Sequence, residues 1–406
     1  MMTYRHFGTL PCRNELFALS VLNKSSLASA LFKRLTDRNM PVVLVGAGPS
    51  LEKNVKELRE VNKRALIVSA SHSLRILQRE GIVPDLIAEI DSKDWAFLEG
   101  ENTACHLLIS SQASLADQKQ QVGRCIYFSF DQNIFMLQEL QEEPVLSDNS
   151  GSVLTEMFEL FVKYGFSRFI LVGQDLAYSK EGDTHAGGEY QNEISGRKHI
   201  RVPGKHGDFV ESRYDWIRFR DYYERQITNH PELTVLDATA EGALIKGAKV
   251  ISLSDAINEV CSKEYPISEW LEKLPKAQSQ DSYICMRKEM VKKTEELKTI
   301  ALQIPRALMD NRRIQMMVNS GQMDSGIYTW ICSQYDSKYH QILDGDASKL
   351  LLFYCEGMLQ DYIANKLSVE AEDKILEKLI LEEQLFTILE EKSKELIQYM
   401  EELWTN

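Results

Sequence analysis

The feature that most constrains the fold is a short apolar segment that runs directly into a glycine-rich turn. Residues 41–45 (PVVLV) are rich in β-branched side chains, which predicts a buried strand. The turn GAGPS (46–50) follows, and residues 51–58 have helical spacing. Glycines let the backbone approach a ligand closely, and free N–H groups at a helix N-terminus favour phosphate. The segment indicates either a nucleotide or nucleotide-sugar site or an ordinary strand-to-helix turn.

The sequence between residues 41 and 253 alternates short apolar strands with amphipathic helices. Strands are expected at 41–45, 65–69, 86–90, 106–110, 125–130 and 169–173, and helices at 72–80 and 152–164. This alternation is typical of a parallel sheet covered on both faces. It predicts an α/β fold with a doubly wound, mostly parallel, Rossmann-type sheet. Ligands bind beyond the carboxyl ends of such strands, so the residues that follow the strands are the candidates for a site.

The expected organisation is a lead-in segment at 1–40, a nucleotide-sugar-binding catalytic α/β domain at 41–260 and a helical C-terminal domain at 261–406. Strand patterns cease after about residue 254, and helices are expected near 288–302, 305–320, 338–365 and 370–404. The apolar stripe of the last helix either packs against the main domain or holds a homo-oligomer together.

Composition excludes several classes of function. The net charge of −13 leaves no basic excess for non-specific binding to nucleic acid or to an anionic membrane surface. The seven cysteines are scattered without a CxxC pair, which is typical of reduced thiols in the cytoplasm. No apolar run approaches the ~20 residues that span a membrane, and no secretion signal opens the chain. A cytoplasmic protein without a tightly bound metal or cofactor is expected.

Polar residues follow the predicted strands in four places. The first is the GAGPS turn, and the second contains Ser69 and Ser71, which could bond a ligand or cap a helix. Asp91 ends the third strand and could hold a ribose hydroxyl, bring in a cation or act as a cap. The fourth place begins with residues 149–152 (NSGS), which precede a helix and form a second phosphate-compatible N-terminus.

The loop after the sixth strand is long and rich in chemistry-bearing residues. It contains Gln174, Asp175, Tyr178, Thr184 and His185. Histidine is the natural general base near neutral pH.

Two further features lie downstream of that loop. His206 is a second candidate base, with a surface histidine as its alternative. The helix at 211–226 carries arginines and aromatic residues, which indicate packing and surface charge or, alternatively, a clamp for a carboxylate or phosphate.

Taken in order, the segments VGAGPSL, GIVPDLIAEID, NSGSV, LVGQDLAYSKEGDTHAGG and LDATAEGALIKGAKVISL resemble the Maf (motility-associated factor) family of bacterial flagellin glycosyltransferases. The resemblance covers roughly residues 35–260. It implies transfer of a nonulosonic acid, of the pseudaminic or legionaminic type, from a CMP-sugar to Ser or Thr of flagellin in the cytoplasm. The implied partners are flagellin and the CMP-sugar.

The layout is also similar to that of bacterial sialyltransferases, which implies roles for individual residues. His185 is the implied base and His206 the second choice, and Asp175 and Tyr178 line the donor site. The implied donor- and phosphate-binding residues are Gly46, Gly48, Pro49, Ser50, Ser69, Ser71, Asp91, Ser150, Gly151, Ser152, Gln174 and Thr184. CMP is a monophosphate leaving group, so a metal-independent reaction is expected.

Two alternatives stay open. The same GxGPSL and PD motifs resemble the archaeal-type 6-hydroxymethyl-dihydropterin pyrophosphokinases, which implies ATP and Mg²⁺. The other alternative is a non-catalytic module that binds nucleotide and flagellin.

The acceptor of the Maf interpretation could also differ from flagellin. The chain begins only about forty residues before GxGPS, whereas many Maf proteins have a longer N-terminal part.

Overall fold

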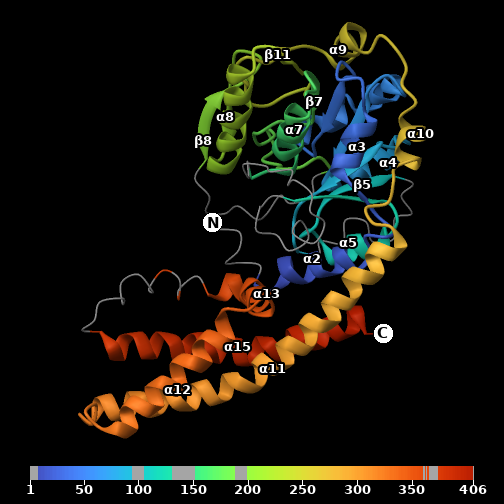
Figure 1. Cartoon of the computed structure of the whole chain (residues 1–406). Coiled ribbons are helices and arrows are strands. Elements are labelled where there is room, and N and C mark those ends of the chain that lie inside the picture. The colour runs from blue at the N-terminus through green and yellow to red at the C-terminus, as the bar shows by residue number, and fades with distance from the viewer. Residues whose placement is uncertain are drawn as a thin grey trace. The chain divides into compact units, whose positions relative to one another are not determined.

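The computed structural model describes residues 8–93, 105–129, 151–187, 199–359, 362, 364 and 374–405. The chain divides into two compact units (Figure 1). One unit is Lys24–Ala277, and the other combines Met1–Asn23 with Gln278–Asn406. The domain boundaries expected from the sequence, between residues 40 and 41 and between residues 260 and 261, stay a prediction.

A parallel sheet forms the centre of the unit Lys24–Ala277. Nine strands of the described residues pair in the order β1-β6-β5-β4-β3-β2-β7-β10-β11, and every neighbouring pair is parallel. The strands, in chain order, are β1 (Ser26–Leu27), β2 (Val42–Val45), β3 (Leu66–Ala70), β4 (Leu86–Glu89), β5 (His106–Ser110), β6 (Cys125–Phe128), β7 (Arg168–Val172), β10 (Thr234–Asp237) and β11 (Lys249–Val250). The doubly wound α/β fold is therefore confirmed.

Alternate residues of each strand enter different cores, which is the physical basis of the double winding. Val42 and Leu44 belong to one apolar cluster, and Val43 and Val45 belong to the other. The first cluster takes residues from α3 (Ala28–Arg34), α7 (Val153–Lys163), α8 (Tyr214–Asn229) and α10 (Ile267–Glu272). The second takes residues from η1 (Pro49–Lys53), η2 (Val55–Val61), α4 (Leu74–Arg79) and α9 (Leu253–Val260).

Local structure departs from the expected elements in a few places. The helix expected at 51–58 is two 3₁₀ helices, η1 and η2, which meet at Asn54. The side-chain amide of Asn54 donates to the carbonyl of Ala238 at 2.8 Å, which anchors this break to the end of β10. The helix expected at 72–80 begins with η3 (Ser71–Ser73). An antiparallel hairpin, β8 (Ile200–Pro203) with β9 (Phe209–Ser212), and the strands β1, β10 and β11 were not expected. The unit also contains α5 (Leu115–Gln120).

The second unit is helical, as expected for the C-terminal part. It contains α2 (Leu10–Ser20), α11 (Gln280–Asn319), α12 (Gly326–Leu343), α13 (Asp346–Cys355), η4 (Glu356–Met358) and α15 (Ile375–Trp404). The helices expected at 288–302 and 305–320 are one helix, α11, which continues through Pro305. Figure 1 shows α11 and α15 running alongside each other.

A buried polar network joins three helices of this unit. Tyr335 of α12 donates its hydroxyl to Glu382 of α15 at 2.7 Å, and Asn311 of α11 donates to the Tyr335 oxygen at 3.0 Å. Asn311 also donates to the carbonyl of Leu379 at 3.1 Å. None of the described helices is long and apolar enough to cross a lipid bilayer.

Candidate active site

The site lies where the order of the strands reverses. From β2 the chain continues outward through β3, β4, β5 and β6 on one side, and β7, β10 and β11 lie on the other side. Ligands of open α/β sheets bind in the crevice at this switch point, beyond the carboxyl ends of the strands. The loops after β2 and β7 meet there, because the Gly46 N–H donates to the Val172 carbonyl at 2.8 Å and the Gly48 N–H to the Gly173 carbonyl at 2.9 Å.

Glycines at this crossing are required by the closeness of the two loops. A Cβ added at Gly46 would lie 2.3 Å from the Gln174 side-chain nitrogen, and one at Gly48 would lie 1.9 Å from Asp175 Oδ2. Gly173 has a φ of +65°, a backbone conformation that favours glycine. The glycines therefore serve the packing of one loop against the other.

Asp175 occupies the N-terminus of η1. Its Oδ1 accepts the backbone N–H of Ser50 at 3.0 Å, while its Oδ2 is buried without a hydrogen-bond partner. Burial raises the pKa of this carboxyl to about 7, although its contacts with Ser50 lower it. One N–H group of the GAGPS turn is thus already bound by a carboxylate of the protein itself. The next residue, Leu176, is in the left-handed region at a φ of 49°, which is rare for a side chain of this kind.

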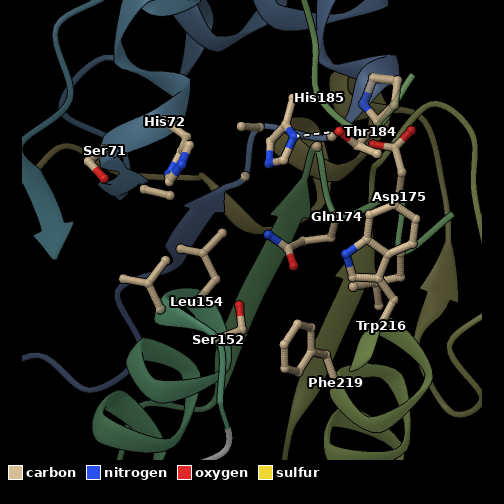
Figure 2. A pocket seen from close by; sticks show the side chains of 18 of the residues that line it. Ser71, His72, Ser152, Leu154, Gln174, Asp175, Thr184, His185, Trp216 and Phe219 are labelled. Carbon is tan, nitrogen blue, oxygen red and sulfur yellow. Dashed lines mark hydrogen bonds between the residues drawn. The ribbon is translucent and has the colours of Figure 1, made fainter. Parts of the chain in front are cut away.

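A cavity of about 320 Å³ opens beside these loops (Figure 2). Its wall combines the loops after β2, β3, β4 and β7 with the start of α7 and one side of α8. The predicted site residues that line it are Gly46, Gly48, Pro49, Ser71, Asp91, Gly151, Ser152, Gln174, Asp175, Thr184 and His185. In Figure 2 the Gln174 amide lies between His185 and Ser152.

Two histidines face each other across part of the cavity. The rings of His72 and His185 are stacked, with centroids 5.5 Å apart and planes 21° apart. His185 Nδ1 lies 2.9 Å from the Thr184 hydroxyl. Burial, followed by the nearby His185, lowers the pKa of His72 to about 4, so His72 is neutral at physiological pH. A ring that contacts both a hydroxyl and a second imidazole is suited to accepting a proton.

Acidic groups gather at the end of β4. Glu89 accepts the backbone N–H groups of Ile90 at 3.0 Å and Asp91 at 2.9 Å through one carboxyl oxygen. Burial raises the pKa of Glu89 to about 7, and burial also raises the pKa of Asp91. Glu89 was not among the residues predicted from the sequence, because its position inside a strand gave no sign that it would border a cavity.

The first residues of α7 form another part of the wall. Gly151 has a φ of +90°, and Ser152 precedes the helix in extended conformation without capping it through its side chain. A phosphate at this helix N-terminus would meet backbone N–H groups and the positive end of the helix dipole. Ser150, which was predicted to bind the same phosphate, lies outside the described residues.

The start of α8 faces the cavity with Trp216 and Phe219, and Arg213, which precedes the helix in extended conformation, lies beside them. Trp216 and Phe219 are three residues apart, which places them on one face of the helix. From the sequence, the arginines and aromatic residues of this helix were expected mainly to pack against the domain and to carry surface charge. The interval of three was the available signal, but it could not show which face would meet a cavity.

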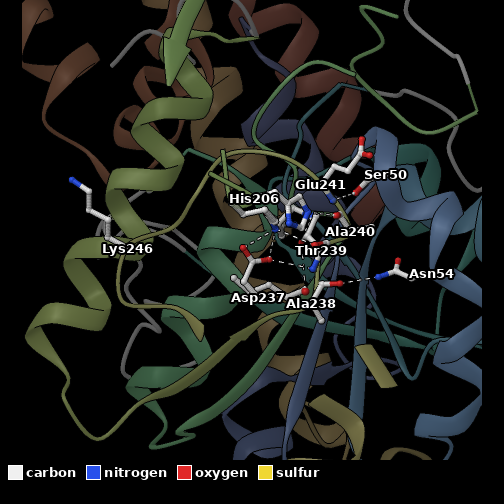
Figure 3. Close-up of polar contacts among 12 residues, drawn as sticks. Ser50, Asn54, His206, Asp237, Ala238, Thr239, Ala240, Glu241 and Lys246 are labelled. Carbon is white, nitrogen blue, oxygen red and sulfur yellow. Dashed lines mark hydrogen bonds and ion pairs between the residues drawn. The ribbon is translucent and has the colours of Figure 1, made fainter. Parts of the chain in front are cut away.

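Four predicted residues with described positions lie away from the cavity wall. Ser50 and Ser69 are buried in local contacts: Ser50 Oγ accepts the Glu241 N–H at 3.2 Å, and Ser69 Oγ lies 2.8 Å from Ser73 Oγ. Tyr178 is buried against Trp216, with ring centroids 4.8 Å apart. His206 is exposed, and its Nε2 lies 3.0 Å from the carbonyl of Ala240 (Figure 3).

Behind His206 lies a buried ion pair that holds the end of β10. The Lys205 ammonium lies 2.8 and 2.7 Å from the two carboxyl oxygens of Asp237 and 3.1 Å from the Thr239 carbonyl. The Thr239 hydroxyl accepts the Gln174 N–H at 3.1 Å. The pair thereby supports the loop that carries Gln174 into the cavity.

Metal ligands are not clustered in the part of the chain that the structure describes. Within those residues, no three His, Cys, Asp or Glu side chains lie together in a way that could hold a metal ion. Glu89, Asp91 and Asp175 border the cavity separately and could share a cation with a ligand's phosphates.

Comparison with known proteins agrees with this fold. The family model described as 6-hydroxymethylpterin diphosphokinase MptE-like matches residues 14–181. Solved structures that match include a MAf glycosyltransferase from Magnetospirillum magneticum AMB-1, with a TM-score of 0.55 and 15% sequence identity over 98% of this chain. The chain spans 61% of that protein's length. No curated protein matches the sequence. The resemblance to both families is confirmed: residues 14–181 match the MptE-like family, and the chain has the fold of a Maf glycosyltransferase.

Proposed function

We propose that this protein is a glycosyltransferase that moves a nonulosonic acid from a CMP-sugar to a Ser or Thr hydroxyl of flagellin in the cytoplasm. The observation that carries the proposal is the cavity at the switch point, which brings His185 and the N-terminus of α7 to one space. A group-transfer site needs a base for the acceptor and a place for the charge of the leaving group, and these two elements supply both. The fold shared with a Maf glycosyltransferase supports the same reaction class.

The proposed reaction is a single displacement at the anomeric carbon. The acceptor oxygen forms a bond to that carbon while the bond between the carbon and the phosphate oxygen of CMP breaks. His185 takes the hydroxyl proton, and CMP leaves with its charge on the phosphate. The Gly151 N–H already donates to Glu156 Oε1 at 3.3 Å. Backbone N–H groups at Ser152 and Val153, at the start of α7, would stabilise that charge, and removal of one such donor costs roughly 10²–10³ in rate in a well-studied hydrolase.

A ligand screen by thermal shift tests the donor. CMP, CDP, UDP, GDP and ATP are each added with and without Mg²⁺. A ligand at 100 times its dissociation constant stabilises the folded state by about 2.7 kcal/mol. We expect a rise in melting temperature with CMP that does not depend on Mg²⁺, and the absence of that rise would contradict the proposal.

A pair of histidine variants tests the base. His185→Ala should lower the turnover of CMP-sugar and purified flagellin at least a hundredfold, in the range of general base catalysis. His206→Ala is the matched control, because His206 is exposed and does not line the cavity. Equal turnover by both variants would exclude His185 as the base. Nucleotide binding by the wild type without any turnover would favour the non-catalytic module.

The second candidate is a Mg²⁺-dependent 6-hydroxymethylpterin pyrophosphokinase. The family match over residues 14–181 favours it. Asp91 and Glu89, at the end of β4, are the carboxylates that could share Mg²⁺ with ATP. A thermal shift with ATP and Mg²⁺ but not with CMP would select this function.

A further inference from the structure

One cation stands out in the wall of the cavity. Of the described residues that line it, Arg213 is the sole Lys or Arg. The other charged side chains in this wall are the carboxyls of Glu89, Asp91 and Asp175, together with the titratable rings of His72 and His185. The cavity therefore has an acidic part at the ends of β4 and β7 and a cationic part at the start of α8.

Arg213 is held in one orientation. Its guanidinium lies over the Trp216 ring, 4.0 Å from the ring centroid, and its Nε lies 2.9 Å from Asp215 Oδ1. The side chain is only 18% exposed. Among the described residues, the terminal nitrogens donate no hydrogen bond to a carboxylate or carbonyl. A planar guanidinium fixed by stacking, with two terminal nitrogens left over, matches the geometry of a bidentate carboxylate.

The start of α7 supplies a different kind of anion site in the same cavity. Gly151 and Phe219 are neighbours across the two helices, since a Cβ at Gly151 would lie 3.2 Å from the Phe219 ring. Backbone N–H groups at that helix end suit a phosphate. The cavity thus offers one position for a phosphate on α7 and a second anion position on α8.

A CMP-linked neutral sugar has only the phosphate as an anion, whereas a sugar acid also has a carboxylate. We propose that Arg213, stacked on Trp216, binds the carboxylate of the donor sugar and selects acidic sugars over neutral ones. This inference rests on the proposed function, because it takes the α7 position as the phosphate site of CMP. Arg213 is on this proposal a specificity residue that does not take part in the proton transfer.

Calorimetric titration of four proteins tests the inference: the wild type, Arg213→Met, Arg213→Lys and Arg218→Met. Arg218 lies in α8, five residues after Arg213, is exposed and does not line the cavity, so its variant is the matched control. The probes are CMP and CMP-N-acetylneuraminic acid. Thermal unfolding without ligand checks that each variant is folded.

We expect Arg213→Met to weaken the binding of CMP-N-acetylneuraminic acid at least tenfold and that of CMP less than threefold. The affinity of Arg213→Lys for CMP-N-acetylneuraminic acid should lie between those of the wild type and Arg213→Met. Lysine keeps the charge but lacks the planar pair of N–H donors that binds a carboxylate in a bidentate way. Arg218→Met should bind both probes as the wild type does. An equal loss of both probes in Arg213→Met would assign Arg213 to the phosphate and overturn this inference while the proposed function stands. A wild type that binds neither probe would overturn the proposed function and the inference with it.

Discussion

The buried ion pair between Lys205 and Asp237 gives a sharp prediction about what stabilises the site. Both side chains are fully buried, and the ammonium contacts both carboxyl oxygens. Asp237→Asn keeps the shape of the side chain but removes its charge, which leaves the Lys205 ammonium buried without a counter-ion. Breaking such a pair by removal of one partner costs about 3–5 kcal/mol.

The size of the effect on melting follows from the size of the unit. In units of about 150–250 residues, 1 kcal/mol changes Tm by roughly 2–4 °C, so Asp237→Asn should lower Tm by about 6–20 °C. The control is Glu259→Gln, which breaks the exposed pair of Glu259 with Lys249 at 2.7 Å. Exposed pairs contribute about 0–1 kcal/mol, so this variant should lower Tm by less than about 4 °C.

Calorimetry of the two variants, together with the double variant Lys205→Met/Asp237→Leu, separates charge from packing. The double variant should recover much of the loss, because apolar residues of similar volume often replace a buried pair at little cost. A Tm for Asp237→Asn equal to that of Glu259→Gln would refute the reasoning. A double variant no more stable than Asp237→Asn would show that packing, and not the uncompensated charge, is what the substitution disturbs.

Three further predictions concern the crossing of the loops, the raised pKa values and the helical unit. Gly48→Ala should destabilise the protein by about 2 kcal/mol or more in urea denaturation and abolish CMP binding, since its Cβ would lie 1.9 Å from Asp175 Oδ2, whereas Gly326→Ala, where nothing lies within 4 Å, should not. The pKa of Asp175 is about 7 in the folded protein and ordinarily 3.8, so the folded state holds this proton more tightly. The unfolding free energy should then fall as pH rises from about 4 to 7, and it should fall less in Asp175→Asn; equal pH dependence of the two would contradict the assignment. Tyr335→Phe should cost about 1–3 kcal/mol in thermal unfolding, because it leaves Glu382 without its 2.7 Å donor, and Tyr214→Phe at an exposed position should be neutral.

The central strands of the sheet were predictable because they are buried on both faces. Val42–Val45 and Leu86–Glu89, for example, consist almost wholly of apolar residues and stand within a residue of their expected limits. β10 and β11 were missed, since Thr234–Asp237 begins and ends with polar residues and Lys249–Val250 has only two residues, both exposed. The order of the strands, and with it the switch point beside β2 and β7, depends on pairing between segments far apart in sequence, which apolar patterning does not encode.

The candidate site, like the sheet, was predictable only in part. Residues that closely follow strands, such as Ser71, Asp91 and Gln174, do line the cavity, because parallel strands all end at the same edge. The sequence could not show that the carboxylate of Asp175, 125 residues away, binds the Ser50 N–H that a ligand phosphate could have used. Nor could it show that Arg213 and Trp216 face the cavity, since helical spacing gives a face but not its partner.

The backbone bonds between the loops after β2 and β7 also constrain how such a protein can change. Gly46 and Gly48 contact Val172 and Gly173 directly, with no side chain between them. A length change or a bulkier residue in one loop therefore requires a matching change in the other. Loop exchange with a relative would succeed only when both segments are transplanted together, and in a diverging lineage substitutions at the two positions should occur in pairs.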